Sequence, residues 1–513
     1  MKSFVTRYWI PLGALLIALF YVPMLTAPFD FIDDGDLVYP MRAATEASWF
    51  EHLQGKIKSN YDHLGAFRPT LHLHWQIQRD LIGSNVFAWH LWRLLWCAMA
   101  VSTFLWFLKE LGFRPIVALF IGAAAFWNRM PNEIWISLTL GEGVALPWAL
   151  LALVAARKAP SSKRPWAWDL TAMVGLLMAL GCKNTFIALA PAMVFLRVAP
   201  DHLSIREGIR RHWLGAAVIC LPVIMPVAHY LYFKANWQPG QYVTKPPSIG
   251  FVTHMLSLQM RAASVDYLGA GLALCIAAII MGKRASSVAT QTGSAESDSS
   301  KPVSTRRAPL VVGLILLICG MGVYLPIGAY GGRYTIPAVW GSLLLVGLLV
   351  SALAQLKPSH WTRAAWIALV AGLIGVAISA NDKRQKMVAR AELLWDALHW
   401  VEANAPDGSA IAWLSGDSNQ GALNVEEGIH FQWHLQNRGK SKVRVVLYDE
   451  MWQPIERVEL PAAQEKPAMA IWGQSSPTTD SMQVLGEFEA TYRFGKRKME
   501  CHIGRRPDAP PSP

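Results

Sequence analysis

Long apolar segments recur through the first three quarters of this 513-residue sequence, and they constrain its fold more than any other feature. A helix needs about 20 mostly apolar residues to cross a bilayer, and somewhat fewer where it is short or buried among other helices. By this criterion the membrane-spanning segments are residues 8–25, 86–107, 115–127, 135–156, 167–181, 185–198, 213–233, 266–281, 310–327, 336–355 and 362–380. The sequence therefore predicts an α-helical polytopic membrane protein with about eleven transmembrane helices.

The composition changes abruptly near residue 381. Only 16% of the chain is charged, against roughly 25% in ordinary soluble domains. Charged and amide side chains return after Ala380, and long apolar runs stop there. We therefore expect a transmembrane domain over residues 1–380 and a soluble domain over residues 381–513.

The soluble part has the pattern of an α/β domain. Residues 385–404 are expected to form a helix that leaves the membrane, and a helical segment at 424–438 lies between strand-like segments at 410–414 and 443–447. That order predicts a βαβ unit. Further strands are expected near residues 454–460, 468–472 and 483–503.

Basic residues set the expected orientation, because cytoplasmic loops of membrane proteins are enriched in Lys and Arg. They collect in alternate loops, at residues 2–7, 109–114, 157–164, 197–211, 283–307 and 357–363. The N-terminus is then cytoplasmic, while the loops 26–85 and 234–265 and the soluble domain lie outside. The segment 282–309 is a cytoplasmic linker, disordered in its Ser/Thr-rich part. These loops account for the net charge of +12 without any nucleic-acid partner.

Four carboxylates follow the first span, at Asp30, Asp33, Asp34 and Asp36. Carboxylates so close together repel one another, which raises the pKa of at least one of them unless a cation lies nearby. A carboxylate with a tuned pKa can act as a general base toward an alcohol or amine. The alternative is a solvated acidic loop, which is the commoner role of such runs.

The rest of the outer loop 26–85 has helical patterning at residues 40–58 and 69–82, typical of helices that lie on the membrane surface. Between them, Pro69 keeps Arg68 out of helical geometry and starts the second helix. Arg68 is then a fixed cation near the bilayer surface, suited to phosphate. The alternatives are headgroup anchoring or pairing with a loop carboxylate.

Two more cations are expected on the outer side. Lys183 lies in a tight turn between two spans, and Arg333 with Tyr334 directly precedes another span. Each alone is more often an anchor at the membrane surface than a ligand. Together with Arg68 and the carboxylates, they suit an amphiphile whose phosphate sits at the interface.

Further polar residues lie in or beside the spans. Glu133 is expected at the outer end of its span and Glu142 two and a half turns deeper, where an ionisable residue needs a cavity or a partner. His90 faces the same side of its helix as Arg93 and is expected to support the site or to be packed. The cysteines form no metal or redox motif, and one disulfide between Cys182 and Cys501 is conceivable.

Taken in order, these motifs resemble the GT-C superfamily of membrane glycosyltransferases, closest to the branch of protein O-mannosyltransferases and related bacterial polyprenyl-phosphate sugar transferases. The matching residues are Asp33-Asp34, Phe67-Arg68-Pro69, Pro131 with Glu133, Lys183 and Arg333-Tyr334. Asn184 stands where the family's Ser-Lys-Glu signature has a carboxylate, so no role is built on that position. The resemblance covers about residues 8–380 and leaves out the soluble tail.

The resemblance implies transfer of a hexose or pentose from a polyprenyl-phosphate donor, such as an undecaprenyl phosphate, to a lipid, glycan or protein. Asp33 or Asp34 is then the catalytic base, with Asp33 favoured because the first acid of the pair usually has that role in the family. The donor phosphate is held by Arg333 with Tyr334, Lys183 and Arg68. No cofactor is certain, and a Mg²⁺ or Mn²⁺ ion held by Asp34 or Asp36 stays open. The expected location is a bacterial cytoplasmic membrane, with the active site and the soluble domain on the periplasmic side.

Two alternatives to this enzyme remain open at the level of sequence. A non-enzymatic flippase of lipid-linked glycans would line a path through the mid-membrane with charges, whereas most polar residues here cluster near one face. An inactive GT-C-like scaffold would act through its soluble tail.

Overall fold

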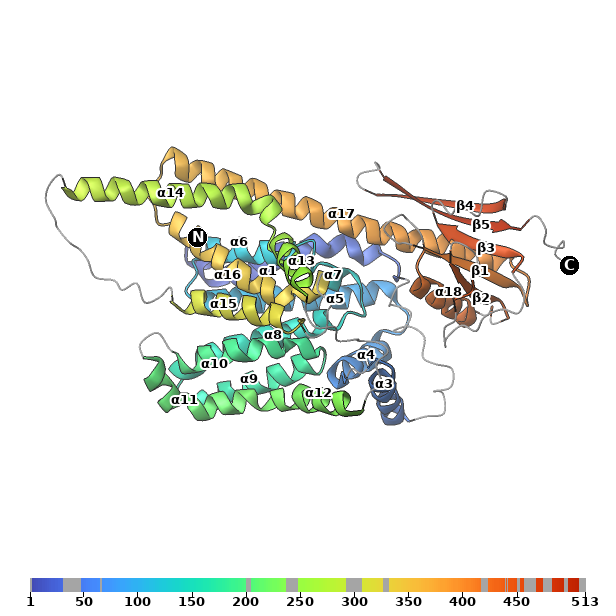
Figure 1. The fold of residues 1–513 in the computed structure, drawn as a ribbon, viewed down its shortest axis with the longest axis horizontal. Coiled ribbons are helices and arrows are strands. Elements are labelled where there is room, and N and C mark those ends of the chain that lie inside the picture. Colours follow the sequence, from blue (N-terminus) through green and yellow to red (C-terminus); the bar gives the residue numbers. More distant parts are fainter. Residues whose placement is uncertain are drawn as a thin grey trace.

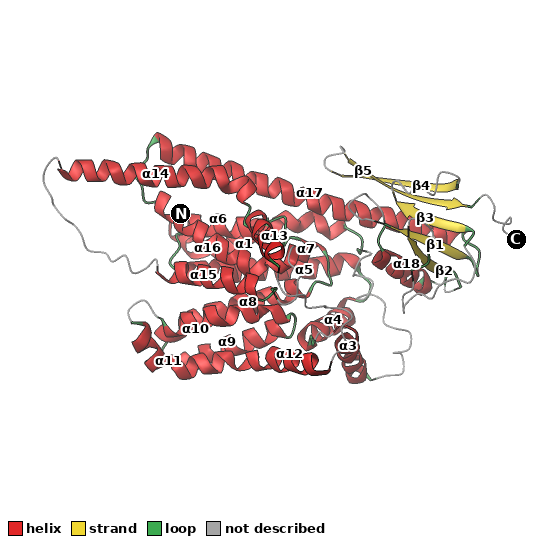
Figure 2. Cartoon of the chain, in the orientation of Figure 1, coloured by secondary structure: helices red, strands yellow, loops and turns green. Residues whose placement is uncertain are grey.

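The chain forms a long helical body with a small sheet at one end (Figure 1). The computed structural model describes residues 2–30, 48–64, 67–199, 204–236, 248–291, 307–325, 332–416, 423–438, 440, 442–449, 453–455, 467–473, 482–492 and 497–506. Helices make up the body, and the strands are confined to the C-terminal unit (Figure 2).

The helices of the body follow the predicted apolar segments closely. They are α1 (Lys2–Ala18), η1 (Leu19–Thr26), α3 (Trp49–Leu64), α4 (Pro69–Ile82), α5 (Val86–Glu110), α6 (Pro115–Phe126), α7 (Glu133–Ile136), α8 (Gly141–Lys158), η3 (Ala159–Ser161), α9 (Pro165–Leu180), η4 (Asn184–Leu189), α10 (Ala190–Val198), α11 (Ile205–Cys220), η5 (Leu221–Val223), α12 (Ile224–Asn236), α13 (Ile249–Ala262), α14 (Val265–Gln291), α15 (Arg307–Gly322), η7 (Gly332–Thr335), α16 (Ile336–Leu353) and α17 (His360–Asn404). Every predicted span falls largely on one or more of them.

A multi-pass membrane protein is confirmed. Five helical stretches are long and apolar enough to cross a bilayer, and α13 with α14, bent by 74°, makes a sixth if the pair is one span. Four shorter apolar helices accompany them within the described part of the chain: Pro115–Phe126, Pro165–Leu180, Asn184–Val198 and Arg307–Gly322. The number eleven stays a prediction.

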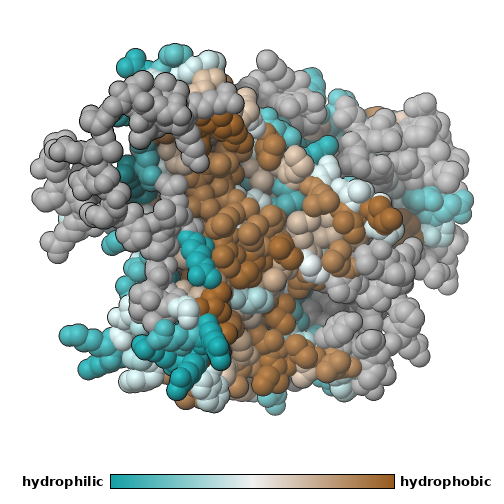
Figure 3. Space-filling model, turned by 60° about the vertical axis from the view of Figure 1, so that its left-hand side comes forward, coloured by the Kyte–Doolittle hydropathy of each residue, from teal (hydrophilic) through white to brown (hydrophobic). Residues whose placement is uncertain are grey.

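The central helix of the body, α8, is apolar around its whole circumference. It is buried almost throughout and packs between α5 and α9, as expected for such a helix. Outer helices instead expose Leu, Ile and Val, for example Leu16 on α1 and Ile367 on α17. Figure 3 shows a broad apolar area on the face in view.

Three basic loops lie at one end of the body. Arg157 donates to the carbonyl of Glu110 and Lys158 pairs with its carboxylate at 3.2 Å, which joins two of these loops. Arg114 donates to the carbonyl of Ala354 at the end of α16, just before the third basic loop, 357–363. Their gathering agrees with the alternation of basic loops in the sequence; which compartment they face stays a prediction.

The predicted span 135–156 is wrong, because the chain is not helical between Ile136 and Gly141. The Arg93 guanidinium donates to the carbonyls of Leu138 and Leu140, and the Leu140 carbonyl also accepts the N–H of Gly143. Gly143 leaves room for Arg93, because a Cβ there would overlap the guanidinium. Glu142 consequently lies in the first turn of α8 and not two and a half turns deep in a continuous helix.

The predicted separation between the last span and the helix that leaves the membrane is also not observed, since α17 runs unbroken for 45 residues. A capping box on Ser359 starts the helix. Its second half, from Leu393 to Val401, forms one core with the C-terminal sheet. The composition change near residue 381 therefore falls inside one rigid helix.

The C-terminal unit is the predicted α/β fold. Parallel strands β1 (Ala410–Ser415) and β2 (Arg444–Asp449) flank helix α18 (Val425–Asn437) in sequence, which confirms the βαβ unit. Three more strands complete a sheet of order β2-β1-β3-β5-β4: β3 (Met469–Gly473), β4 (Gln483–Tyr492) and β5 (Arg497–Arg505). The segment expected as one strand at 483–503 is an antiparallel pair. Of the strand expected at 454–460, Pro454 forms an isolated bridge, and 456–460 lie outside the described residues.

The linker, one surface helix and the cysteine pair also differ from expectation. Helix α14 continues to Gln291, so the start of the expected linker 282–309 is helical, and 292–306 lie outside the described part. Helix α3 extends to Leu64, six residues beyond the expected end. Cys182 and Cys501 are both buried and free, so no disulfide joins them.

Candidate functional site

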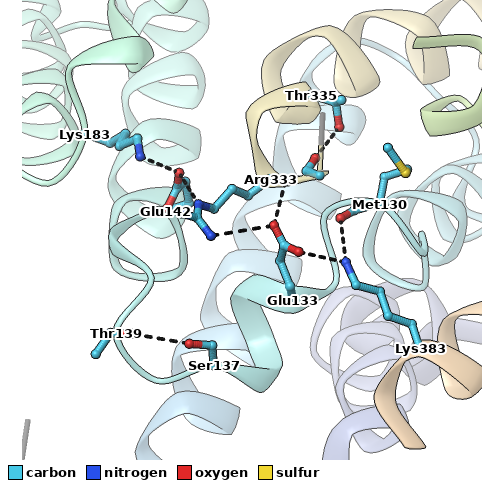
Figure 4. Close-up of polar contacts among 10 residues, drawn as sticks. Met130, Glu133, Ser137, Thr139, Glu142, Lys183, Arg333, Thr335 and Lys383 are labelled. Atoms are coloured by element: carbon cyan, nitrogen blue, oxygen red, sulfur yellow. Dashed lines mark hydrogen bonds and ion pairs between the residues drawn. The ribbon is translucent and has the colours of Figure 1, made fainter. Parts of the chain in front are cut away.

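Five charged side chains from separate elements meet beside the break between α7 and α8 (Figure 4). Glu142 comes from α8, Glu133 from α7, Lys183 from the turn before η4, Arg333 from η7 and Lys383 from α17. We call these five residues the ion-pair cluster. Sequence analysis had placed all but Lys383 among the site or supporting residues.

Glu142 is the buried centre of the cluster. Its side chain is 4% exposed, and its Oε1 lies 3.0 Å from Lys183 Nζ and 3.6 Å from Arg333 Nε. A buried carboxylate is costly unless it is paired, and here two cations share one oxygen. The N-terminal position on α8 adds the favourable end of the helix dipole.

Tyr334 lies under both cations. Lys183 Nζ is 4.9 Å and Arg333 Cζ 5.2 Å from the centre of its ring. Cation–π contacts at such distances are favourable, and Tyr324 packs against the same ring at 5.3 Å. The ring is therefore a shared contact of the two cations.

Glu133 connects Arg333 to α17. Its Oε1 accepts the backbone N–H of Arg333 at 2.9 Å and lies 3.9 Å from Arg333 Nη1, while its Oε2 lies 2.8 Å from Lys383 Nζ. Gly332 makes this approach possible: it has φ of +50°, and a Cβ there would lie 2.8 Å from Glu133 Oε1. Glycine is favoured where backbone must take positive φ beside another group.

Arg68 lies near the cluster, outside α4 and just before Pro69, as predicted. The start of α4 docks on the turn before Lys183, where Leu71 N–H donates to the Gly181 carbonyl at 3.3 Å. Burial lowers the pKa of the Lys183 ammonium; Glu142 opposes this shift, and the charges of Arg68 and Arg333 add to it. The three cations predicted to hold phosphate are therefore electrostatic neighbours.

The predicted catalytic carboxylates Asp33 and Asp34, together with Asp36, lie outside the residues that the structure describes. The segment that leads to them is well anchored. Phe29 is buried against Trp89 and Leu138, and its carbonyl accepts the Trp395 indole N–H at 2.9 Å. Asp30, the last described residue before the gap, lies within electrostatic range of Arg390.

His90, predicted as a supporting residue, is buried beside the backbone of Ala27 and Pro28. This position favours packing at the base of the acidic segment. Among the described residues, no three His, Cys, Asp or Glu side chains group closely enough to hold a metal ion. The residues suggested for a metal, Asp34 and Asp36, lie outside that set.

Arg68, Lys183, Arg333 and Lys383 bring four positive charges to this region against the two carboxylates, a formal net charge of +2. Such an excess suits a phosphate, because guanidinium and ammonium groups bind phosphate oxygens through charge-assisted hydrogen bonds. The exposed fraction of the Arg333 side chain, 30%, leaves that cation accessible to a ligand.

Sequence analysis missed the part played by Lys383 and the structural role of Arg93. Lys383 lies three residues after the last apolar run, at the expected boundary between the two domains. A basic residue within one turn of a span's end was the signal available, and it is a weak one. Arg93 stood out only as a neighbour of His90.

No protein-family model matches this chain, and no curated protein matches it. Among solved structures, the chain is similar to the archaeal oligosaccharyltransferase AglB from Archaeoglobus fulgidus, in complex with an inhibitory peptide and a dolichol-phosphate. The match covers 86% of this chain and 64% of AglB, with a TM-score of 0.41 and 11% identity. The chain thus spans less than two thirds of the length of that protein.

Proposed function

We propose that this chain is an inverting glycosyltransferase of the GT-C type, which moves a sugar from a polyprenyl-phosphate donor to an acceptor at the outer face of the membrane. The observation that carries the proposal is the convergence of Lys183 and Arg333 on buried Glu142, over the ring of Tyr334. Lys183, Arg333 and Tyr334 also belong to the GT-C-like motifs of the sequence, which were identified without knowledge of these contacts.

In this proposal, Lys183, Arg333 and Arg68 bind the donor phosphate. The phosphodiester of the donor carries one negative charge, and the phosphate monoester that leaves carries nearly two at neutral pH. The charge that develops on the leaving phosphate is therefore what the cations stabilise. Positively charged groups that are already in place when the reaction starts contribute most to such stabilisation.

Asp33 is the proposed base. It takes a proton from an acceptor hydroxyl or amine, and the acceptor atom attacks the anomeric carbon opposite the phosphate. The bond between that carbon and the phosphate oxygen breaks, its electrons stay on the polyprenyl phosphate, and the configuration inverts. Asp34 supports Asp33 in this role.

The acceptor is a lipid, glycan or protein, and the C-terminal unit projects from the body on the side expected to be periplasmic (Figure 1). We propose the cytoplasmic membrane of a bacterium as the location. The membrane lipids and the donor are then the partners nearest the site.

Transfer of a radiolabelled sugar by the purified chain in detergent tests the proposal, because a flippase performs no chemistry when there is no membrane to cross. We expect Asp33→Asn and Arg333→Met to lower transfer at least 100-fold, in line with the loss of a general base or an oxyanion-stabilising group. Arg129→Met is the control, since Arg129 is exposed near the same end of the body. Full activity of both test variants would refute the mechanism.

A further inference from the structure

The cluster receives one cation from α17, the helix that also carries the C-terminal unit. Lys383 Nζ contacts Glu133 Oε2 at 2.8 Å and the Met130 carbonyl at 3.4 Å. Three residues earlier on the same helix, the Ala380 carbonyl accepts the Asn132 side-chain amide at 3.0 Å. Three contacts therefore hold the short segment Met130–Glu133 against α17.

Both oxygens of Glu133 are engaged, and on different partners. Lys383 binds Oε2, while Oε1 accepts the backbone N–H of Arg333. A carboxylate fixed by donors on both oxygens has little rotational freedom, so Lys383 determines where Oε1 can lie. Since Gly332 and Arg333 approach that oxygen closely, the position of η7 depends on it.

Helix α17 holds Lys383 rigidly. Its first half packs along α14, and its second half is built into the core of the C-terminal unit. Arg390, seven residues after Lys383 and so on the same helix face, pairs with Glu427 of the C-terminal unit through Nη2 and Oε2 at 2.7 Å. The Glu427 side chain is fully buried. A side chain on a helix anchored at both ends is a firm support for a neighbouring site.

We propose that Lys383 is a positioning residue of the phosphate site, which acts through Glu133 to place Arg333. Its ammonium faces Glu133 and Met130, whereas Arg333 and Lys183 face Glu142 (Figure 4). The inference rests on the proposed function for the identity of the ligand, a polyprenyl phosphate. It adds to that function a residue from the helix that joins the two parts of the protein.

The test measures the affinity of the full chain, in lipid nanodiscs, for undecaprenyl phosphate. We expect Lys383→Met to weaken binding about tenfold, because residues in one ion-pair network are energetically coupled. Lys383→Arg should restore affinity to within about threefold, because a guanidinium can also reach Glu133. Lys386→Met, an exposed residue on the same helix, is the matched control and should change nothing.

A double-mutant cycle separates positioning from direct contact. If Lys383 acts through Arg333, then Lys383→Met adds less than twofold to the loss already caused by Arg333→Met, and Glu133→Gln behaves like Lys383→Met. Full, independent effects of the two cations would overturn the inference, as would unchanged binding by Lys383→Met. If undecaprenyl phosphate binding follows this pattern but the protein transfers no sugar, the proposed function is refuted and the positioning role of Lys383 stands.

Discussion

Replacing Glu142 by Gln removes the negative charge that Lys183 and Arg333 share, without changing the size of the side chain. At an effective dielectric constant of about 20, unit charges 3.0 and 3.6 Å apart each attract by about 5 kcal/mol. Desolvation of the carboxylate offsets much of this attraction, and breaking a buried ion pair costs about 3–5 kcal/mol in practice. Arg333 is partly exposed, so we expect a loss near 3 kcal/mol.

The assay is thermal unfolding of the purified protein in detergent, with and without undecaprenyl phosphate. The Glu142→Gln variant should unfold several degrees lower than the wild type. Undecaprenyl phosphate should raise the unfolding temperature of this variant by more than it raises that of the wild type, because its phosphate replaces the missing negative charge between Lys183 and Arg333.

A matched substitution is available at the other end of the body. Glu110→Gln removes the partner of Lys158, whose side chain is 31% exposed, and exposed pairs contribute only about 0–1 kcal/mol. If Glu142→Gln unfolds no earlier than Glu110→Gln, the carboxylate is not the electrostatic centre of the cluster. If the lipid phosphate stabilises both proteins equally, the anion binds elsewhere.

Three further predictions address the backbone, the pH dependence and the metal question. Gly332→Ala should weaken undecaprenyl phosphate binding about tenfold, through both strain and overlap, while Gly408→Ala, also at positive φ but with open space around it, should leave binding unchanged. Burial lowers the pKa of His434 to about 3. As the pH falls through about 6.5, the unfolded chain therefore takes up a proton that the folded C-terminal unit does not. Its stability should therefore fall by about 2 kcal/mol between pH 7 and pH 5, measured by tryptophan fluorescence during unfolding, and His434→Phe should remove most of that loss. Finally, EDTA should lower transfer less than twofold, because the cations already offset the phosphate charge; a tenfold loss that Mg²⁺ restores would assign an ion to Asp34 and Asp36.

Local patterns were enough to locate most of the helices. Each predicted apolar segment falls largely on helical structure, and Pro69 starts α4 as expected. The exceptions arose where a distant residue overrides the local pattern. The chain between Ile136 and Gly141 is apolar enough for a helix, but Arg93 on α5 satisfies its carbonyls and stabilises the break.

For the candidate site, too, the sequence indicated the residues but not their contacts. The sequence indicated Lys183, Arg333, Glu133 and Glu142 by residue type and by their place at the ends of spans. It did not reveal that Glu142 pairs with both cations, and it gave no role to Lys383. The acidic pair Asp33-Asp34 was equally visible in the sequence, and its position lies outside the described residues.

The membrane-embedded class, the helical segments and the α/β nature of the tail follow from local patterns, because hydrophobic periodicity and length are local properties. Which charges meet depends instead on how distant segments pack. Glu133 contacts Arg333 and Lys383 across separations of 200 and 250 residues, and no local pattern encodes such distances. Burial then makes each contact specific, since a charge withdrawn from water is stable only beside its partner.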